Sequence, residues 1–319
     1  MKLLSKLAIL SVFALGATAA SAQTYPDRPV RVIVTTVPGP LDAFARAVLE
    51  QVQKRLKQPF VVENKAGAGG NLGADIVAKA PPDGYTLLFA LDTTFTVNPT
   101  LYAKMPFDVS KDFVPIAVPV TYGQALAVNP ALKITSVADF VKRVKEQRMS
   151  YASGGNGSPS HLTMAAFLAT AGIQMTHVPY KGTGASVIDV MSGQVDSVFA
   201  VSSGILPFAK AGRLQALATS GDRRSPAAPD LPTVAESGYP GFSANFAYAL
   251  LAPAGTPDPI VKLLASEVEA AMATKEVIEL DRISDYTPTG LNQAQSAAWL
   301  ADARKRWAEV IRKANITVE

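Results

Sequence analysis

The apolar residues form two alternating patterns along most of the chain. Short runs rich in β-branched and aromatic residues, such as Val30 to Val34, predict buried strands. Most of these runs lead through a loop to apolar residues at helical spacing, as in Phe44, Val48, Val52 and Leu56. Further strands are expected at residues 60–63, 85–91, 112–120, 124–129, 149–153, 176–178, 195–201, 214–219 and 246–252. The alternation of strands with helices predicts the α/β fold class.

Chain length and the order of these elements predict two α/β domains. The chain has 319 residues, of which 48% are hydrophobic, and this is enough for two cores. It leaves the first unit near Val118 to Gln124 and returns near Asn245 to Ala249, so two strands should form a hinge. We expect one domain from residues 23–121 and 248–319, and a second from residues 122–247.

Residues 1–22 have the features of a cleavable export signal. Lys2 and Lys6 precede the apolar run Leu7 to Ala17, and Ala20-Ser21-Ala22 forms an A-x-A cleavage site. The apolar run is too short to span a bilayer. A lipoprotein would need a cysteine at the cleavage point, and the chain contains none. The sequence therefore predicts a free periplasmic protein that begins at Gln23 and has no disulfides.

Charge and residue usage argue against several classes of function. Removing Lys2 and Lys6 from the 30 basic residues leaves 28 against 26 acidic ones, a net charge of +2 (28 − 26). That balance does not suit a nucleic acid partner. The chain has two histidines, His161 and His177, and no cysteine, so we expect no metal site. Hydrolase elbow, Walker and Ser-x-x-Lys motifs are absent, so we expect neither an enzyme nor a bound cofactor.

The most distinctive stretch runs from Ser150 to Leu162. A short strand enters a loop with glycines at positions 154, 155 and 157, and a helix follows. Glycines let backbone N–H groups approach a ligand, and the first turn of a helix adds unpaired donors and a positive dipole end. Such a loop could hold an anion without lysine or arginine. It could equally be a strand-to-helix turn in which Ser158 or Ser160 only caps the helix.

Two other loops have the same construction. Residues 35–42 lead into a helix, with Pro40 suited to its first position and Asp42 near its N-terminus. Residues 179–184 lead into another helix through two glycines and Thr183. Asp92 to Phe95 follow a strand directly, at the end where ligands of open α/β sheets bind. Three helix starts of this kind favour an anion-binding protein.

Several motifs resemble those of one receptor family. They are Tyr25 to Pro29, Val62 to Asn71, Pro81 to Thr86, Tyr151 to Gly157, His177 to Gly182 and Leu231 to Gly238. Together they resemble the Bug-type receptors, which are the extracytoplasmic solute-binding proteins of tripartite tricarboxylate transporters. The resemblance covers essentially the whole mature chain. It implies a type II periplasmic-binding-protein fold whose two domains close around a small organic carboxylate and deliver it to a membrane permease.

The resemblance also implies which residues line the cleft. Matched by position, the ligand-binding residues are Pro38, Gly39, Pro40, Leu41, Asp42, Thr93, Thr94, Phe95, Gly157, Ser158, Ser160, His161, Tyr180, Gly182, Thr183, Ala200 and Ser202. Relatives usually have glycine and a hydroxyl residue at Pro40 and Leu41, so this chain loses an N–H and a hydroxyl there. They often have an acid at Ala200, so we do not expect recognition of an ammonium group. Leu41 and Phe95 should instead favour a carboxylate with an apolar body.

Two alternative functions would use the same cleft. The protein could present its ligand to a signalling receptor as a sensor or accessory protein, or it could be an exported α/β hydrolase or isomerase. Permease genes beside this one would favour transport, and a sensor-kinase gene would favour signalling. Turnover of esters or hydroxy acids would indicate an enzyme. In the transport hypothesis, the partners are a carboxylate and the permease subunits, and the receptor is a monomer.

Overall fold

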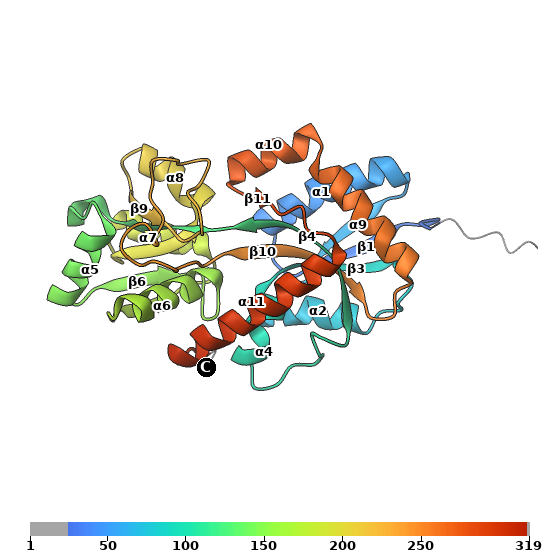
Figure 1. Ribbon diagram of the computed structural model, residues 1–319, viewed down its shortest axis with the longest axis horizontal. Coiled ribbons are helices and arrows are strands. Elements are labelled where there is room, and N and C mark those ends of the chain that lie inside the picture. Colours follow the sequence, from blue (N-terminus) through green and yellow to red (C-terminus); the bar gives the residue numbers. More distant parts are fainter. Residues whose placement is uncertain (1–24, 318–319) are drawn as a thin grey trace, which may run out of the picture.

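The computed structural model describes residues 25–317 and contains two β-sheets (Figure 1). The strand order is β11-β4-β10-β3-β1-β2 in the first sheet and β7-β6-β8-β5-β9 in the second. We call the parts built around them the first lobe and the second lobe. The fold is therefore α/β with two lobes, and the predicted fold class is confirmed. The predicted export signal, residues 1–22, lies outside the described residues.

The first lobe combines both ends of the chain. Its strands are β1 (Val30–Val34), β2 (Phe60–Asn64), β3 (Thr86–Leu91), β4 (Phe113–Tyr122), β10 (Phe246–Pro253) and β11 (Thr287–Pro288). Its helices are α1 (Pro40–Leu56), α2 (Asn71–Ala78), α3 (Thr93–Thr96), α4 (Asn98–Leu101), α9 (Asp258–Met272), α10 (Lys275–Ser284) and α11 (Gln293–Lys313). Both faces of the sheet are covered, because Val32 packs in the cluster of α1 and the next residue, Ile33, packs in the cluster of α2. Burial on both faces explains why four of the five residues of β1 are apolar; the exception, Arg31, is partly exposed and pairs with Glu63 of β2 at 2.8 Å.

The second lobe is formed by the middle of the chain. Its strands are β5 (Gln124–Val128), β6 (Ser150–Ser153), β7 (Thr176–Pro179), β8 (Ser197–Val201) and β9 (Gln215–Thr219). Its helices are α5 (Val137–Glu146), α6 (Pro159–Ala171), α7 (Thr183–Ser192) and α8 (Ser202–Lys210). Residues 220–245 follow β9, and their backbone bonds to it and to β5 hold them against this lobe.

Two strands connect the lobes, as the order of elements predicts. β4 ends at Tyr122, and only Gly123 separates it from β5 in the other sheet. The chain returns through β10, whose Phe246 pairs with Tyr122. Figure 1 shows β4 and β10 side by side where they cross between the lobes. A connection of one residue fixes where the hinge lies but leaves its angle free to change.

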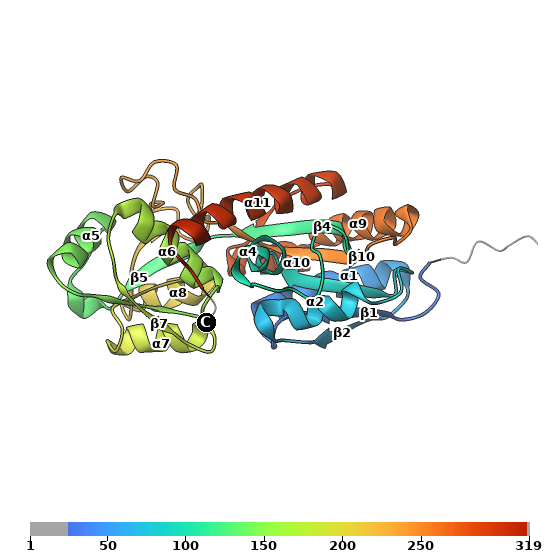
Figure 2. The same cartoon turned by 90° about the horizontal axis from the view of Figure 1, so that it is seen from below.

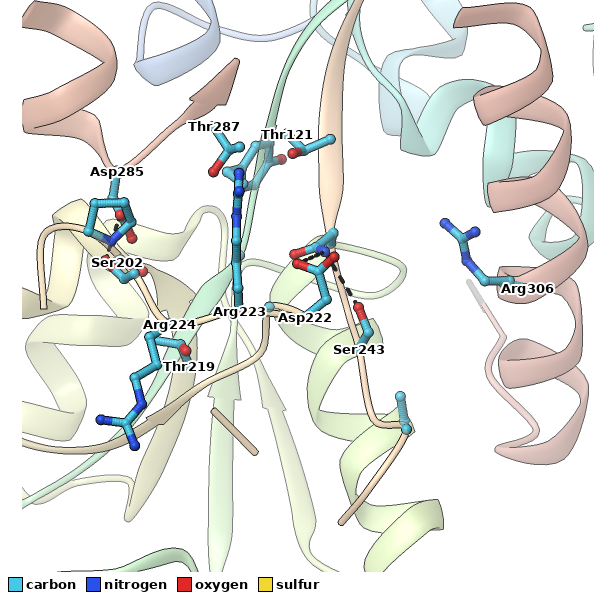
Figure 3. A pocket seen from close by; sticks show the side chains of 18 of the residues that line it. Thr121, Ser202, Thr219, Asp222, Arg223, Arg224, Ser243, Asp285, Thr287 and Arg306 are labelled. Atoms are coloured by element: carbon cyan, nitrogen blue, oxygen red, sulfur yellow. Dashed lines mark hydrogen bonds between the residues drawn. The ribbon is translucent and has the colours of Figure 1, made fainter. Parts of the chain in front are cut away.

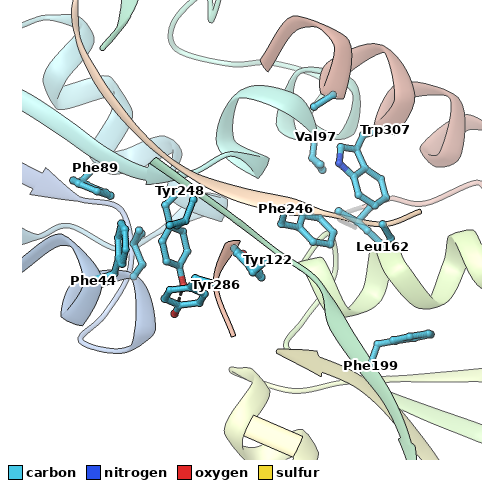
Figure 4. Packing of buried hydrophobic residues seen from close by; sticks show 14 of the residues in the cluster. Phe44, Phe89, Val97, Tyr122, Leu162, Phe199, Phe246, Tyr248, Tyr286 and Trp307 are labelled. Carbon is cyan, nitrogen blue, oxygen red and sulfur yellow. Dashed lines mark hydrogen bonds between the residues drawn. The ribbon is translucent and has the colours of Figure 1, made fainter. Parts of the chain in front are cut away.

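A row of aromatic side chains runs through the first lobe to the hinge (Figure 4). The ring centroids of Phe44 and Tyr248 lie 5.4 Å apart, and those of Tyr248 and Tyr122 lie 5.1 Å apart. Phe246 stacks on Trp307 of α11 at 4.8 Å. Trp307 is 4% exposed and anchors α11 in the core. α11 begins with a capping box formed by Asn292 and Gln295, contacts β4 and reaches α6 of the second lobe.

Candidate ligand-binding site

Strand directions place six loops at the junction between the lobes. β3 and β4 are both antiparallel to β10, so β3 runs toward the hinge, and β1 and β2 run parallel to it. In the second sheet, β6, β7 and β8 are parallel, and the last residue of β8 pairs with Gln124 beside the hinge. The carboxyl ends of β1, β2 and β3 therefore point toward the second lobe, and those of β6, β7 and β8 point toward the first. We call these ends the facing edges; Figure 2 shows α2 on one side of the junction and α6 and α7 on the other.

At the facing edge of the first lobe, Gly70 in the loop after β2 lies against Thr35, which follows β1, and against Thr94 of α3. A Cβ atom at Gly70 would lie 2.4 Å from the hydroxyl oxygen of Thr94 and 3.2 Å from Cβ of Thr35. Thr35 is 3% exposed, and its hydroxyl has no hydrogen-bond partner among the described residues. Neither Thr35 nor Gly70 is among the site residues expected from the sequence. The glycine-rich loop directly after β2 is the signal that could have indicated them.

The start of α1 lies at the same edge and offers backbone donors. Gly39 is the N-cap without a side-chain cap, and Pro40 is the first helical residue, as predicted. The N–H groups of Leu41 and Asp42 come before Ala43, the first residue to donate back along the chain. Helix geometry leaves such groups without an intrahelical acceptor. No other acceptor is assigned to them within residues 25–317. Pro38 and Pro40 are exposed on the loop.

The side chains at this helix start differ from the expectation. Leu41 is 3% exposed and packs in the core, so the prediction that its side chain faces a ligand is wrong. It lies three residues before Phe44 and therefore on the inner face of α1. The Asp42 carboxylate accepts bonds from Arg46 and Asn64 at 3.0 and 2.9 Å. The Arg46 bond is the main reason why its pKa is lowered, and the carboxylate is occupied within the lobe.

The residues after β3 form a short helix instead of an open loop. Thr93, Thr94 and Phe95 belong to α3 and are 5%, 0% and 1% exposed. Phe95 packs edge-on against Phe113 with the ring centroids 5.1 Å apart. The prediction that Phe95 supplies apolar surface to a ligand is therefore wrong. Because Leu41 is also buried, the predicted preference for an apolar ligand body loses both side chains on which it depends.

A buried acid fixes the connection between β3 and α3. The Asp92 carboxylate is fully buried and accepts a bond from the N–H of Ala247 in β10 at 3.0 Å. It also accepts from the hydroxyl of Thr96 at 3.2 Å. Desolvation raises its pKa to about 7, although these bonds oppose the shift. Asp92 ties the facing edge to the hinge strand and does not reach toward the second lobe.

The glycine-rich loop between β6 and α6 uses most of its donors internally. Three backbone donors bond to side chains: Gly154 N–H to Ser160 Oγ, Gly155 N–H to Ser153 Oγ, and Gly157 N–H to His161 Nδ1. The Ser158 N–H donates to the carbonyl oxygen of Gly155. The expectation that these groups hold an anion stays a prediction; in this structure three neighbouring side chains and one carbonyl oxygen already accept their bonds. Ser158 is the N-cap of α6, which confirms the alternative reading of this serine.

His161 and His177 hold this loop as a neutral pair. Their rings stack with centroids 4.0 Å apart, and Tyr151 stacks on His177 at 4.8 Å. Desolvation, and secondly the neighbouring His177, lower the pKa of His161 to about 4. Neutral His161 keeps Nδ1 free to accept the N–H of Gly157 at 3.1 Å. Among the described residues, no group of three or more side chains is arranged to hold a metal.

On the second lobe, the start of α7 resembles the start of α1, because neither helix has a side-chain cap. Gly182 is the N-cap with φ 111° and no side-chain cap, and Thr183 is the first helical residue. The N–H groups of Thr183 and Gly184 have no acceptor assigned in the described part of the chain. A Cβ at Gly154 would lie 2.8 Å from the Thr183 hydroxyl oxygen, so the two loops are in contact. The Tyr180 hydroxyl donates to Asp189 of the same helix at 2.6 Å.

The two expected residues near the end of β8 are both 1% exposed. Ala200 pairs with Ala125 in the sheet, and its methyl group lies in the core of the second lobe. The prediction that Ala200 lines the ligand site is therefore not supported by its position. Ser202 begins α8 and lines a cavity beside the hinge.

Comparisons with known proteins point to one family. The family model "Tripartite tricarboxylate transporter family receptor" matches residues 44–316. Protein BugT of Bordetella pertussis is 35% identical over 96% of both chains. Among solved structures, an R. palustris protein with adipate has a TM-score of 0.84 at 30% identity, covering 92% of this chain and 99% of that one. MatC from Rhodopseudomonas palustris with bound malate has a TM-score of 0.80 at 30% identity, covering 90% and 100%.

Proposed function

The chain belongs to the tripartite tricarboxylate transporter receptor family, and we propose that it captures a small organic carboxylate between its lobes and delivers it to a membrane permease. Proteins of this family are solute-binding receptors, and the malate- and adipate-bound relatives hold carboxylates. The adipate-bound and malate-bound proteins share the fold of this chain over nearly its whole length. A carboxylate is thus the ligand class that the family and the site have in common.

The observation that supports the proposal is the pair of uncapped helix starts on opposite lobes. α1 presents the N–H groups of Leu41 and Asp42, and α7 presents those of Thr183 and Gly184. Each helix start adds the positive end of its dipole, which favours an anion without a formal positive charge. A carboxylate that bonds to both starts would hold the lobes together. The Thr35 hydroxyl is a further donor at the first-lobe edge.

We assign the two moving bodies to the ranges expected from the sequence. These are residues 23–121 with 248–319, and residues 122–247. The chain then passes from one body to the other next to Gly123 and near the start of β10, where the two sheets are joined. Closing around a ligand requires backbone rotation at these two points only. Such hinge motion is the usual way in which periplasmic receptors enclose small molecules.

The place of action follows from the family and from the first residues of the sequence. The related BugD is a periplasmic binding protein. We propose that residues 1–22 direct export, that they are removed after Ala22, and that the mature receptor is a free monomer. Within residues 25–317, none of the helices is long and apolar enough to cross a membrane.

The test is a thermal-shift and calorimetric titration with malate, adipate, benzoate and dimethyl adipate. At least one of the three carboxylates should raise the melting temperature and bind with measurable heat. Dimethyl adipate keeps the carbon chain of adipate but has no charge, so it should do neither. The bound compound should be recovered unchanged, as expected for a receptor. If no carboxylate binds, or if the diester binds as well as adipate, the proposal is wrong.

A further inference from the structure

A cavity of about 500 Å³ lies beside the hinge, and Ser202, which directly follows β8, is part of its wall (Figure 3). Sheet order fixes its position. In the first sheet, β11 pairs with β4 on the side opposite β10, β3 and β1. In the second sheet, β9 pairs with β5 on the side opposite β8, β6 and β7. The cavity includes Thr287 of β11 and Thr219 of β9, so it borders the rear side of the hinge.

One hydrogen bond joins the two lobes on this rear side. The Ser225 hydroxyl donates to the Asp285 carboxylate at 2.6 Å. Ser225 belongs to the segment after β9 in the second lobe, and Asp285 ends α10 in the first lobe. Ser225 is 7% exposed, so water competes little for this bond. A bond to a charged acceptor is stronger than one between neutral groups.

A positively charged side chain of the second lobe lines the same cavity as Asp285. Arg223 lies two residues before Ser225 and lines the same cavity, and Figure 3 shows its side chain extending toward Thr287 and Thr121. No ion pair or hydrogen bond is assigned to its guanidinium within residues 25–317. The neighbouring Arg224 is different, because it pairs with Glu236 of its own lobe at 2.9 Å. Arg223 thus adds a positive charge to the wall of the cavity that Asp285 also lines.

We propose that Ser225, Asp285 and Arg223 form a rear latch that stabilises the open arrangement of the lobes. β4 and β10 act as the pivot, with the facing edges on one side and the latch on the other. Closing the facing edges moves β9 away from β11, which lengthens the Ser225–Asp285 bond. The latch therefore opposes closure and lowers the affinity for whatever the lobes enclose, because only a fraction of molecules is ready to close.

The chain allows a direct test by spin-label distance measurement, because it has no cysteine of its own. Leu72→Cys in α2 and Ile188→Cys in α7 would carry the labels, since these side chains are 51% and 59% exposed. In the ligand-free protein, Ser225→Ala and Asp285→Asn should both shift the distance distribution toward shorter distances. Asn tolerates the left-handed conformation of residue 285, whose φ is 59°, so the second variant keeps the backbone.

Asp230→Asn is the matched control, because it removes a charge from the same surface segment without touching the latch. Its distribution should equal that of the parent protein. An unchanged distribution in both latch variants would overturn the proposal. So would a shift toward longer distances, since that would mean that the bond holds the lobes closed. This measurement needs no ligand and stands whether or not the proposed function is correct.

A second measurement rests on the proposed function and uses adipate or malate, whichever binds to the parent protein. By calorimetry, Ser225→Ala should bind that carboxylate roughly tenfold to a hundredfold more tightly, the size expected for one lost hydrogen bond to a charged acceptor. The double variant with Asp285→Asn should add little, because both changes break the same latch. Unchanged or weaker binding by Ser225→Ala would overturn the latch and leave the receptor function intact. Absence of binding by the parent would contradict the function alone.

Discussion

Replacing Thr183 with proline isolates one backbone donor of the proposed carboxylate site. Thr183 is the first residue of α7, and two other helices at the facing edges, α1 and α6, already have proline at this position. Proline is favoured there because the N–H has no intrahelical acceptor and φ is already close to the required value. The preceding Gly182 has ψ 151°, which lies in the range that a residue before proline adopts, and as a glycine it tolerates its positive φ of 111°. The substitution should therefore preserve the helix.

The expected loss of affinity follows from the bond that is removed. A hydrogen bond to a charged group contributes about 1.5–3 kcal/mol. At 1.4 kcal/mol for each factor of ten, the dissociation constant should rise roughly tenfold to a hundredfold. The hydroxyl of Thr183 is lost at the same time. Thr183→Val removes the hydroxyl but keeps the N–H, so the difference between the two variants measures the backbone donor.

Calorimetric titration with the carboxylate that binds best would give the affinities, and thermal unfolding without ligand would give the stabilities. Thr183→Pro should weaken binding much more than Thr183→Val, while the melting temperature stays close to that of the parent. Ser158→Pro is the contrasting case. The Ser158 N–H donates to Gly155 within the turn, so its loss should lower the melting temperature. Equal affinity in the parent and Thr183→Pro would refute the role of α7, and a parallel loss of stability would show that Thr183 only builds the turn.

Three further predictions concern closure, the core and pH. Saturating carboxylate should reduce the radius of gyration in solution scattering, and an unchanged curve would argue against a closing hinge. Leu41→Ala should cost about 2–5 kcal/mol of unfolding free energy in denaturant titration, because Leu41 is 3% exposed, and it should leave ligand preference unchanged. The pKa of His161 in the folded protein, about 4, lies below its ordinary value of 6.5. The stability that depends on neutral His161 should therefore be complete above pH 6.5 and decrease by roughly 3 kcal/mol as the pH falls to 4. His161→Gln should flatten this part of the stability curve, and a curve that keeps its slope would place the titrating group elsewhere.

The sequence by itself determined the order of the elements and the place of the hinge. Runs such as Val30 to Val34 are apolar at four of five positions because helices cover both faces of the sheet, and this pattern is local. Helix starts are local as well. Pro40 occupies the first position of α1 as expected, and Ser136 and Asn292 cap their helices with their own side chains. The motifs that indicated the receptor family are likewise contained in short stretches of sequence.

Only the tertiary structure decided which polar groups remain free for a ligand. Gly157 and Ser158 have the composition of an anion-binding loop, but His161 and the carbonyl of Gly155 accept their N–H groups. Leu41 follows an exposed proline and yet points into the core, because the direction of a helix axis is set by packing on the sheet. Ser225 and Asp285 are far apart in the sequence and meet only because two lobes turn about one pair of strands. Contacts of this kind depend on the path of the whole chain, and no local pattern encodes them.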